Sequence, residues 1–210
     1  KTVTVHRGQS PHATEDGHLL VHHDPQVTGL GMIGSLPAAS LASHRLPNGE
    51  PIPTLAEALS ILAGLDVWIE VKTLPPVSDQ RLFEALDQGP TPDKYGVHAF
   101  DHRIIDRLGE QRPHLRRGVL LASYLLDNLP VLRAVGADTL WMETHLIDEA
   151  LVEELHCDGC QIIGWTANDD VEVRRLAQLG VDGICGNYPD RIRTALVDHN
   201  RGVASAAASR

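Results

Sequence analysis

The chain has 210 residues, of which 42% are hydrophobic and 22% charged, and its formal net charge is −10 at pH 7. This length and composition predict one soluble globular domain over residues 1–200, with a sizeable buried core. The acidic balance and the lack of Lys/Arg runs argue against nucleic acid or an anionic membrane surface as a partner.

No apolar stretch reaches the roughly 18 residues that a membrane-spanning helix needs. The first residues, "KTVTVHRG", lack the apolar region of a signal peptide. The sequence therefore predicts a cytoplasmic protein without an integral membrane segment.

Short β-branched or apolar runs alternate with amphipathic helical patterns along the chain, which predicts β/α units around a parallel sheet. The predicted strands are residues 3–6, 18–23, 66–72, 95–100, 116–121, 137–142, 161–166 and 181–186.

The run "PTLAEALSILAG" (53–64) carries both ends of a predicted helix. Thr54 lies three residues before Glu57, which is the spacing of a capping box, and Gly64 follows the last turn. Further helices are predicted in "NDDVEVRRLAQLG" (168–180) and "PDRIRTALVDHN" (189–200), whereas the small-residue tail 201–210 is expected to be disordered.

Strands separated by helices, with no G-x-G-x-x-G turn, favour a TIM-type (β/α)8 barrel over an open doubly wound sheet. In "DVWIEVK", Trp68, Glu70 and Lys72 share one face of the predicted strand, because side chains alternate along a strand. In a barrel this polar face looks inward near the C-terminal rim, where the catalytic groups of the fold lie. A half-exposed antiparallel strand would show the same alternation.

Basic, acidic and histidine side chains stand at the ends of several predicted strands, and in a barrel these ends converge on one mouth. They are His6, Arg7, His23, Glu70 and Lys72. A histidine can take or supply a proton near pH 7, cations can hold a phosphate, and a carboxylate can hold a hard divalent cation. The set predicts acid–base chemistry on a phosphate.

Several motifs occur in a fixed order between Val3 and about Leu196: "HRG", "EDGHLLVHHD", "IPTLAEAL", "WIEVK", "HAFDH", "GWTAND" and "GVDGICGNYPDRI". Together they resemble the glycerophosphodiester phosphodiesterases, whose barrel relatives include the phosphatidylinositol-specific phospholipases C. The resemblance implies a hydrolase of lipid metabolism that converts a small glycerophosphodiester to glycerol 3-phosphate and an alcohol.

The resemblance also implies a role for each matching residue. His6 and His23 would form the general acid–base pair, and His22 is the less favoured partner because the family places the histidine directly before the aspartate. Glu70 would be a ligand of Ca²⁺ or Mg²⁺. The implied substrate-binding residues are Arg7 and Lys72, which would hold the phosphate, and Trp165, which would line the mouth.

Family members carry a helix and a second strand between the "HRG" loop and the "DG" turn, with a Pro-Glu-Asn motif and a Glu-x-Asp pair of metal ligands. This chain runs directly from "HRGQSPHA" to "TEDG". We therefore expect a barrel shortened by about one β/α unit, roughly thirty residues, and a weakly bound cation. We predict that residues 3–6 pair with residues 18–23, which would close such a barrel.

Other interpretations remain open at this point. The missing ligands would also fit a non-catalytic barrel remnant that keeps a phosphate-binding ability. A zinc site from His12, His18, His22 and His23 is disfavoured because these spacings match no familiar zinc pattern. The C-x-x-C pair Cys157 and Cys160 lacks a second half, so "HCDGC" is interpreted as a structural turn.

Overall fold

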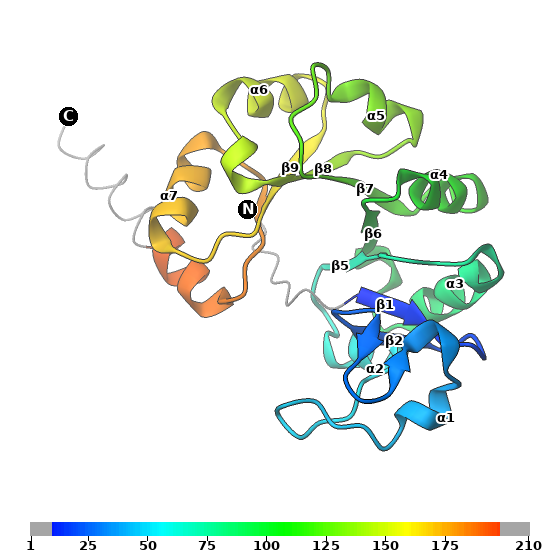
Figure 1. Cartoon of the computed structure of the whole chain (residues 1–210). Helices are drawn as coiled ribbons and strands as arrows, with labels where there is room; N and C mark the ends of the chain where they lie inside the picture. The colour runs from blue at the N-terminus through cyan, green and yellow to red at the C-terminus, as the bar shows by residue number, and fades with distance from the viewer. Residues whose placement is uncertain (1–9, 198–210) are drawn as a thin grey trace, which may run out of the picture. The chain divides into compact units, whose positions relative to one another are not determined.

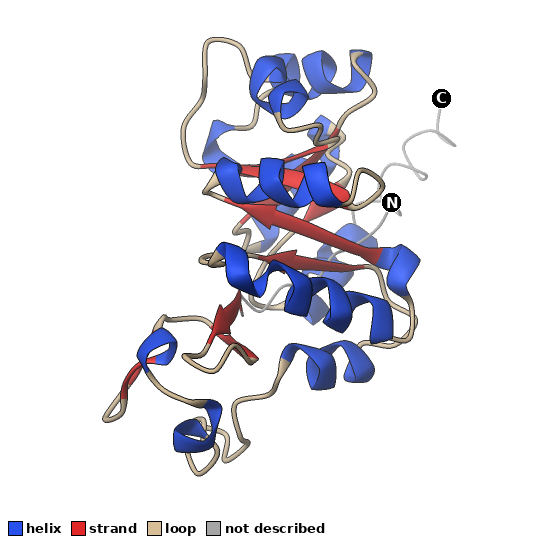
Figure 2. Ribbon diagram, turned by 90° about the vertical axis from the view of Figure 1, so that its right-hand side faces the viewer, coloured by secondary structure: helices blue, strands red, loops and turns tan. Residues whose placement is uncertain are grey.

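The computed structural model describes residues 10–197, which fall into two compact units, 10–116 and 117–197. Helices alternate with strands through most of each unit (Figure 1), and Figure 2 shows the helices beside the strands. The chain therefore has the α/β fold that the sequence predicts. The predicted strand 3–6, with His6 and Arg7, and the tail 201–210 lie outside the described residues.

The first unit opens with an antiparallel hairpin. Strand β1 (Ser10–Ala13) pairs with strand β2 (Leu19–His22), with Ser10 opposite His22. The turn between them is held by the Thr14 hydroxyl, which accepts a hydrogen bond from the His18 amide at 2.9 Å. Gly17 has a φ of +80°, a left-handed conformation that glycine adopts without steric cost.

The expectation that residues 18–23 form a parallel barrel strand is wrong. One edge of β2 pairs antiparallel with β1, and on its other edge Val21 N donates to Pro53 O at 2.8 Å while Leu20 bridges Thr54. The Asp-Gly turn explains this arrangement, because Asp-Gly between two short runs favours a hairpin. Strand β2 therefore takes its neighbours from residues 10–13 and 53–54, and its predicted partner 3–6 lies outside the described residues.

A second hairpin and two helices complete this part of the unit. Strands β3 (Gln26–Val27) and β4 (Gly31–Met32) pair antiparallel and are followed by helices α1 (Ala38–Leu41) and α2 (Leu55–Ile61). Thr54 and Glu57 form the predicted capping box at the start of α2. A small apolar core holds these pieces together and consists of Leu20, Val27, Ile33, Leu41 and Ile52.

The rest of the first unit has the parallel β/α pattern. Strand β5 (Val67–Glu70), helix α3 (Asp79–Gln88), strand β6 (Tyr95–Ala99) and helix α4 (His102–Gln111) follow in order, and β5 pairs parallel with β6. Trp68 lies opposite Gly96, where an added Cβ would meet the indole ring at 2.7 Å. The Trp68 indole also meets the His98 ring edge-on. The face of β5 that carries Trp68 and Glu70 therefore continues on β6 with Gly96 and His98.

The second unit repeats the pattern. Its elements are strand β7 (Arg116–Leu121), helix α5 (Leu129–Ala134), strand β8 (Thr139–Glu143), helix α6 (Glu149–Cys157), strand β9 (Gln161–Trp165), helix α7 (Asp170–Leu179) and strand β10 (Gly183–Ile184). The four strands pair in parallel in chain order, and residues 189–197 form a further helix. Buried residues of β8 and β9, including Leu140, Met142 and Ile162, pack with helix residues such as Leu151 and Leu176.

Two further observations bear on the sequence predictions. Cys157 ends α6 and Cys160 precedes β9, with Gly159 between them at a φ of +75°, so "HCDGC" forms the expected turn and both thiols are free. Within residues 10–197, none of the helices combines the length and hydrophobicity needed to cross a membrane.

Candidate active site

Glu70 ends strand β5 and faces the start of β1. The Ser10 hydroxyl, which is fully buried, donates a hydrogen bond to Glu70 Oε2 at 3.2 Å. One carboxylate and one hydroxyl therefore meet where the sequence predicts a metal ligand. Hard divalent cations prefer six or more oxygen ligands, and several of these can be water.

The described residues do not form a full metal centre. Within 10–197, no three His, Cys, Asp or Glu side chains gather in a group that could hold a metal ion. The histidines considered for a zinc site, His12, His18, His22 and His23, do not form such a group. Glu70 and Ser10 provide too few protein ligands for tight binding of Ca²⁺ or Mg²⁺, because one carboxylate alone holds such a cation weakly.

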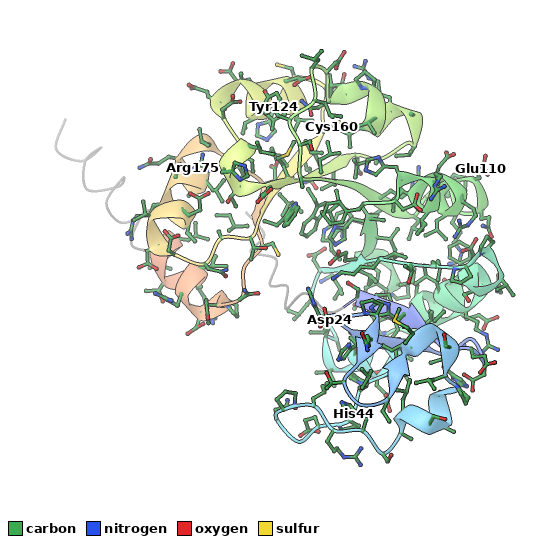
Figure 3. All side chains as sticks on the ribbon, viewed as in Figure 1. Asp24, His44, Glu110, Tyr124, Cys160 and Arg175 are labelled. Atoms are coloured by element: carbon green, nitrogen blue, oxygen red, sulfur yellow. The ribbon has the colours of Figure 1, made fainter. Side chains whose placement is uncertain are left out.

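His23 follows β2 and is held by its neighbour Asp24. His23 Nδ1 and Asp24 Oδ1 are 2.8 Å apart, and both side chains are largely exposed (Figure 3 labels Asp24). The hydrogen bond from His23 lowers the pKa of Asp24, so the carboxylate is ionised and can only accept. Nδ1 must then carry the hydrogen, which leaves Nε2 of the neutral ring able to accept a proton.

Lys72 connects the end of β5 to the His23 segment. Its ammonium group donates to the main-chain carbonyl oxygen of His23 at 3.1 Å. His22, in contrast, has its Nδ1 2.8 Å from the carbonyl oxygen of Asp24. The structure thus brings His23 and Lys72 together, while Glu70 lies two residues before Lys72 on the same strand end.

Trp165, His6 and Arg7 are the remaining predicted site residues. Trp165 ends β9 in the second unit, and its register partner on β8 is Glu143. His6 and Arg7 belong to the part of the chain that is not described.

His12 is a neighbour of the site that the sequence motifs do not single out. It lies on β1 with only 3% of its surface exposed. Burial lowers the pKa of His12, hydrogen bonding to the backbone of His23 and His22 opposes that change, and the positive charge of Lys72 adds to it. The hairpin register is the signal that could have found it, because pairing β1 with β2 places His12 opposite Leu20, two residues before His22.

The buried His12 predicts a pH dependence of stability. The pKa of His12 in the folded chain lies below the usual value near 6.5. As the pH falls through that value, the unfolded chain therefore binds more protons than the folded chain. We expect the free energy of unfolding to decrease below about pH 6.5. Urea unfolding at several pH values should show a smaller decrease in the free energy of unfolding for His12→Gln than for the wild type. His18→Gln, at an exposed position, should behave like the wild type. An equal decrease in all three proteins would contradict the prediction.

Comparison with known proteins adds the following findings. The model of the glycerophosphoryl diester phosphodiesterase family matches residues 12–191. A glycerophosphodiester phosphodiesterase of Caldanaerobacter subterraneus is 27% identical over 85% of this chain and 80% of its own length, and one of Bacillus altitudinis is 24% identical over the same shares. The solved structure of an Oleispira antarctica phosphodiesterase with its product sn-glycerol-3-phosphate has a TM-score of 0.84 at 20% identity, covering 93% of this chain and 85% of that one.

Proposed function

Because the chain belongs to the glycerophosphoryl diester phosphodiesterase family, we propose that it hydrolyses a glycerophosphodiester to glycerol 3-phosphate and an alcohol. The observation that carries this proposal is the placement of His23. Its ring is oriented by Asp24, and its backbone is held by Lys72 beside the strand end that carries Glu70. The Oleispira antarctica phosphodiesterase, whose fold this chain shares, binds the product that this reaction would release.

The proposed chemistry uses His6 and His23 as an acid–base pair. One neutral imidazole takes a proton from the attacking water, a P–O bond forms, and the P–O bond to the alcohol breaks while the other, protonated imidazole supplies the proton that the alcohol carries away. Arg7 and Lys72 would offset the negative charge of the phosphate, and Trp165 would line the mouth.

A divalent cation, Ca²⁺ or Mg²⁺, is part of the proposal and would be held by Glu70. When bound, such a cation supplies positive charge next to the phosphate. The ligand set among residues 10–197 fits only weak binding, since Glu70 has the Ser10 hydroxyl beside it rather than a second carboxylate.

The fold details that go with this function are also proposed. We infer one barrel domain over residues 1–200 that lacks about one β/α unit compared with a complete TIM-type barrel. The direct passage from "HRGQSPHA" to "TEDG" supports this inference, because residues 6–17, which include the short strand β1, are too few for a further β/α unit of roughly thirty residues.

The weak metal site can be tested by adding a ligand. In Ser10→Asp, a carboxylate would replace the hydroxyl 3.2 Å from Glu70 Oε2, giving a cation two carboxylates to bridge. We expect Ca²⁺ affinity, measured by calorimetry, to rise by about tenfold, since ligand charge count sets the affinity of such sites. Ser10→Asn, of similar size and without the charge, is the control. Equal affinities of the two variants would contradict a metal site at Glu70.

The test of the reaction is release of glycerol 3-phosphate from glycerophosphocholine, with Ca²⁺ or Mg²⁺ added. We expect product formation by the wild-type chain above the rate in enzyme-free buffer. Absence of product with both cations and with several head groups would overturn the proposal.

A second candidate is a non-catalytic remnant that binds phosphate. It is favoured by the lack of a three-ligand metal group among the described residues. This protein would bind inorganic phosphate or glycerol 3-phosphate, with affinity reduced in Lys72→Ala, but would release no product from a diester. Divalent cation binding that is lost in Glu70→Ala would count against it.

A further inference from the structure

A surface hollow lies in the first unit, between the β1–β2 turn and the chain that enters α3. We call it the α3 hollow. Its volume is about 470 Å³, and most of its wall comes from residues between 13 and 17, residues between 73 and 78, and Arg81. A hollow of this size can hold a small organic molecule. None of the residues that line it belongs to the set proposed for hydrolysis.

Arg81 brings an unpaired positive charge to the α3 hollow. Its side chain passes across Gly17, where an added Cβ would come within 2.9 Å of Arg81 Nε and 3.3 Å of Arg81 Cζ. Among residues 10–197, the Arg81 guanidinium has no hydrogen-bond or ion-pair partner, whereas Arg107 on the next helix pairs with Asp79. A guanidinium without a partner can bind a carboxylate through two parallel hydrogen bonds.

Ser78 offers a second group to an anion in the α3 hollow. It is the N-cap residue of α3 and only 4% exposed, and its hydroxyl bonds to no amide of the helix. This hydroxyl has no other partner within the described part of the chain, although Ser78 lines the hollow. A nearly buried hydroxyl without a hydrogen bond costs free energy, so a ligand oxygen would supply the missing partner. The positive end of the α3 dipole adds to the attraction.

Glu15 brings an unpaired negative charge to the same wall. Its side chain is exposed and has no partner among the residues that the structure describes. Asp16, the other acidic residue of the wall, is engaged, because the Thr14 hydroxyl and the Ala38 amide donate to Asp16 Oδ1 at 2.6 and 3.0 Å. The α3 hollow therefore presents one cation and one anion that do not pair with each other.

We propose that the α3 hollow binds a small zwitterion, namely an amino acid whose carboxylate and ammonium groups are separated by several carbon atoms. The carboxylate would bind Arg81 and the Ser78 hydroxyl, and the ammonium group would bind Glu15. A simple anion fits less well because Glu15 would repel it, and a simple cation would leave Arg81 unpaired. The apolar part of the wall, against which the carbon chain would lie, consists of Ala13, Pro75 and Val77.

The test compares three compounds with similar carbon chains and different charges. Calorimetry of the full chain with 4-aminobutyrate should show saturable binding. Butyrate carries only the negative charge and butylamine only the positive charge, so each should bind about tenfold more weakly. Equal binding of the three compounds, or no saturable binding of 4-aminobutyrate, would overturn the proposal.

Variants assign each charge to its residue. Arg81→Gln should weaken the binding of both 4-aminobutyrate and butyrate by about tenfold, whereas Glu15→Gln should weaken only that of 4-aminobutyrate. Ser78→Ala, which removes no charge, should weaken both to a smaller extent. The matched controls Arg103→Gln and Glu110→Gln, at exposed positions of α4, should leave binding unchanged (Figure 3 labels Glu110).

The outcomes do not depend on the proposed reaction, because no step of the test measures hydrolysis. Binding of 4-aminobutyrate that requires Arg81 and Glu15 supports the site even if no diester is hydrolysed. Full binding by Arg81→Gln or by Glu15→Gln would overturn the site and leave the reaction intact.

Discussion

His23→Ala should reduce the rate of glycerol 3-phosphate release by a factor of about 10²–10⁴, the usual contribution of a positioned acid–base group. Alanine removes the ring nitrogen that would exchange the proton, and it leaves the Asp24 carboxylate without its 2.8 Å partner. The backbone carbonyl that accepts from Lys72 is retained, so the loss should come from the imidazole rather than from the strand end. Steady-state kinetics with glycerophosphocholine measures it.

Two other histidines serve for comparison. His22→Ala should have a smaller effect, because the His22 ring interacts with the backbone of Asp24 rather than with its carboxylate. His44→Ala should leave the rate unchanged, since His44 lies in the loop after α1, away from the site (Figure 3). A His23→Ala variant that is folded and as active as wild type would reject His23 as a proton carrier.

Asp79→Ala should lower the free energy of unfolding by about 3 kcal/mol, the scale expected when one partner of a buried ion pair is removed. Asp79 lies in the first turn of α3 with its side chain only 4% exposed. It accepts hydrogen bonds from Arg107 at 2.7 and 2.9 Å and from Gln111 at 2.8 Å, which ties α3 to α4. Removal of the carboxylate leaves the Arg107 guanidinium, itself mostly buried, without its anion.

Asp87→Ala is the matched control on the same helix. Asp87 also pairs with an arginine, Arg112, but its side chain is 55% exposed. Exposed ion pairs contribute at most about 1 kcal/mol, because water already solvates both charges. Urea unfolding should therefore show a clearly larger decrease in the free energy of unfolding for Asp79→Ala than for Asp87→Ala. Equal decreases would contradict the assigned role of burial.

The sequence predicts those elements whose structure follows from the pattern of residues within them. Helix α2 is recognisable because Thr54 and Glu57 satisfy its first amide groups, and this cap forms as expected. Strand β5 is recognisable from its alternation, since apolar and polar residues take opposite faces. The approach of Lys72 to His23 also agrees with the idea that these strand ends meet, although the chemical roles of both residues stay predictions.

The sequence does not reveal strand pairing and contacts that depend on a turn or on residues far along the chain. Strand β1 contains Pro11, which argues against a strand when taken alone, and only the hairpin with β2 gives it partners. The burial of His12 is missed for the same reason, because it arises from that hairpin. The Ser10–Glu70 contact joins residues sixty positions apart, a separation that no local pattern spans.

The pairing of β2 on both of its edges has a consequence for self-association. A strand with an open edge offers unpaired amide and carbonyl groups to another molecule, and this is a common start of aggregation. In β2 the groups around Leu20 and Val21 already bond to β1 on one side and to residues 53–54 on the other. This apolar stretch directly before His23 is therefore shielded from strand exchange between molecules.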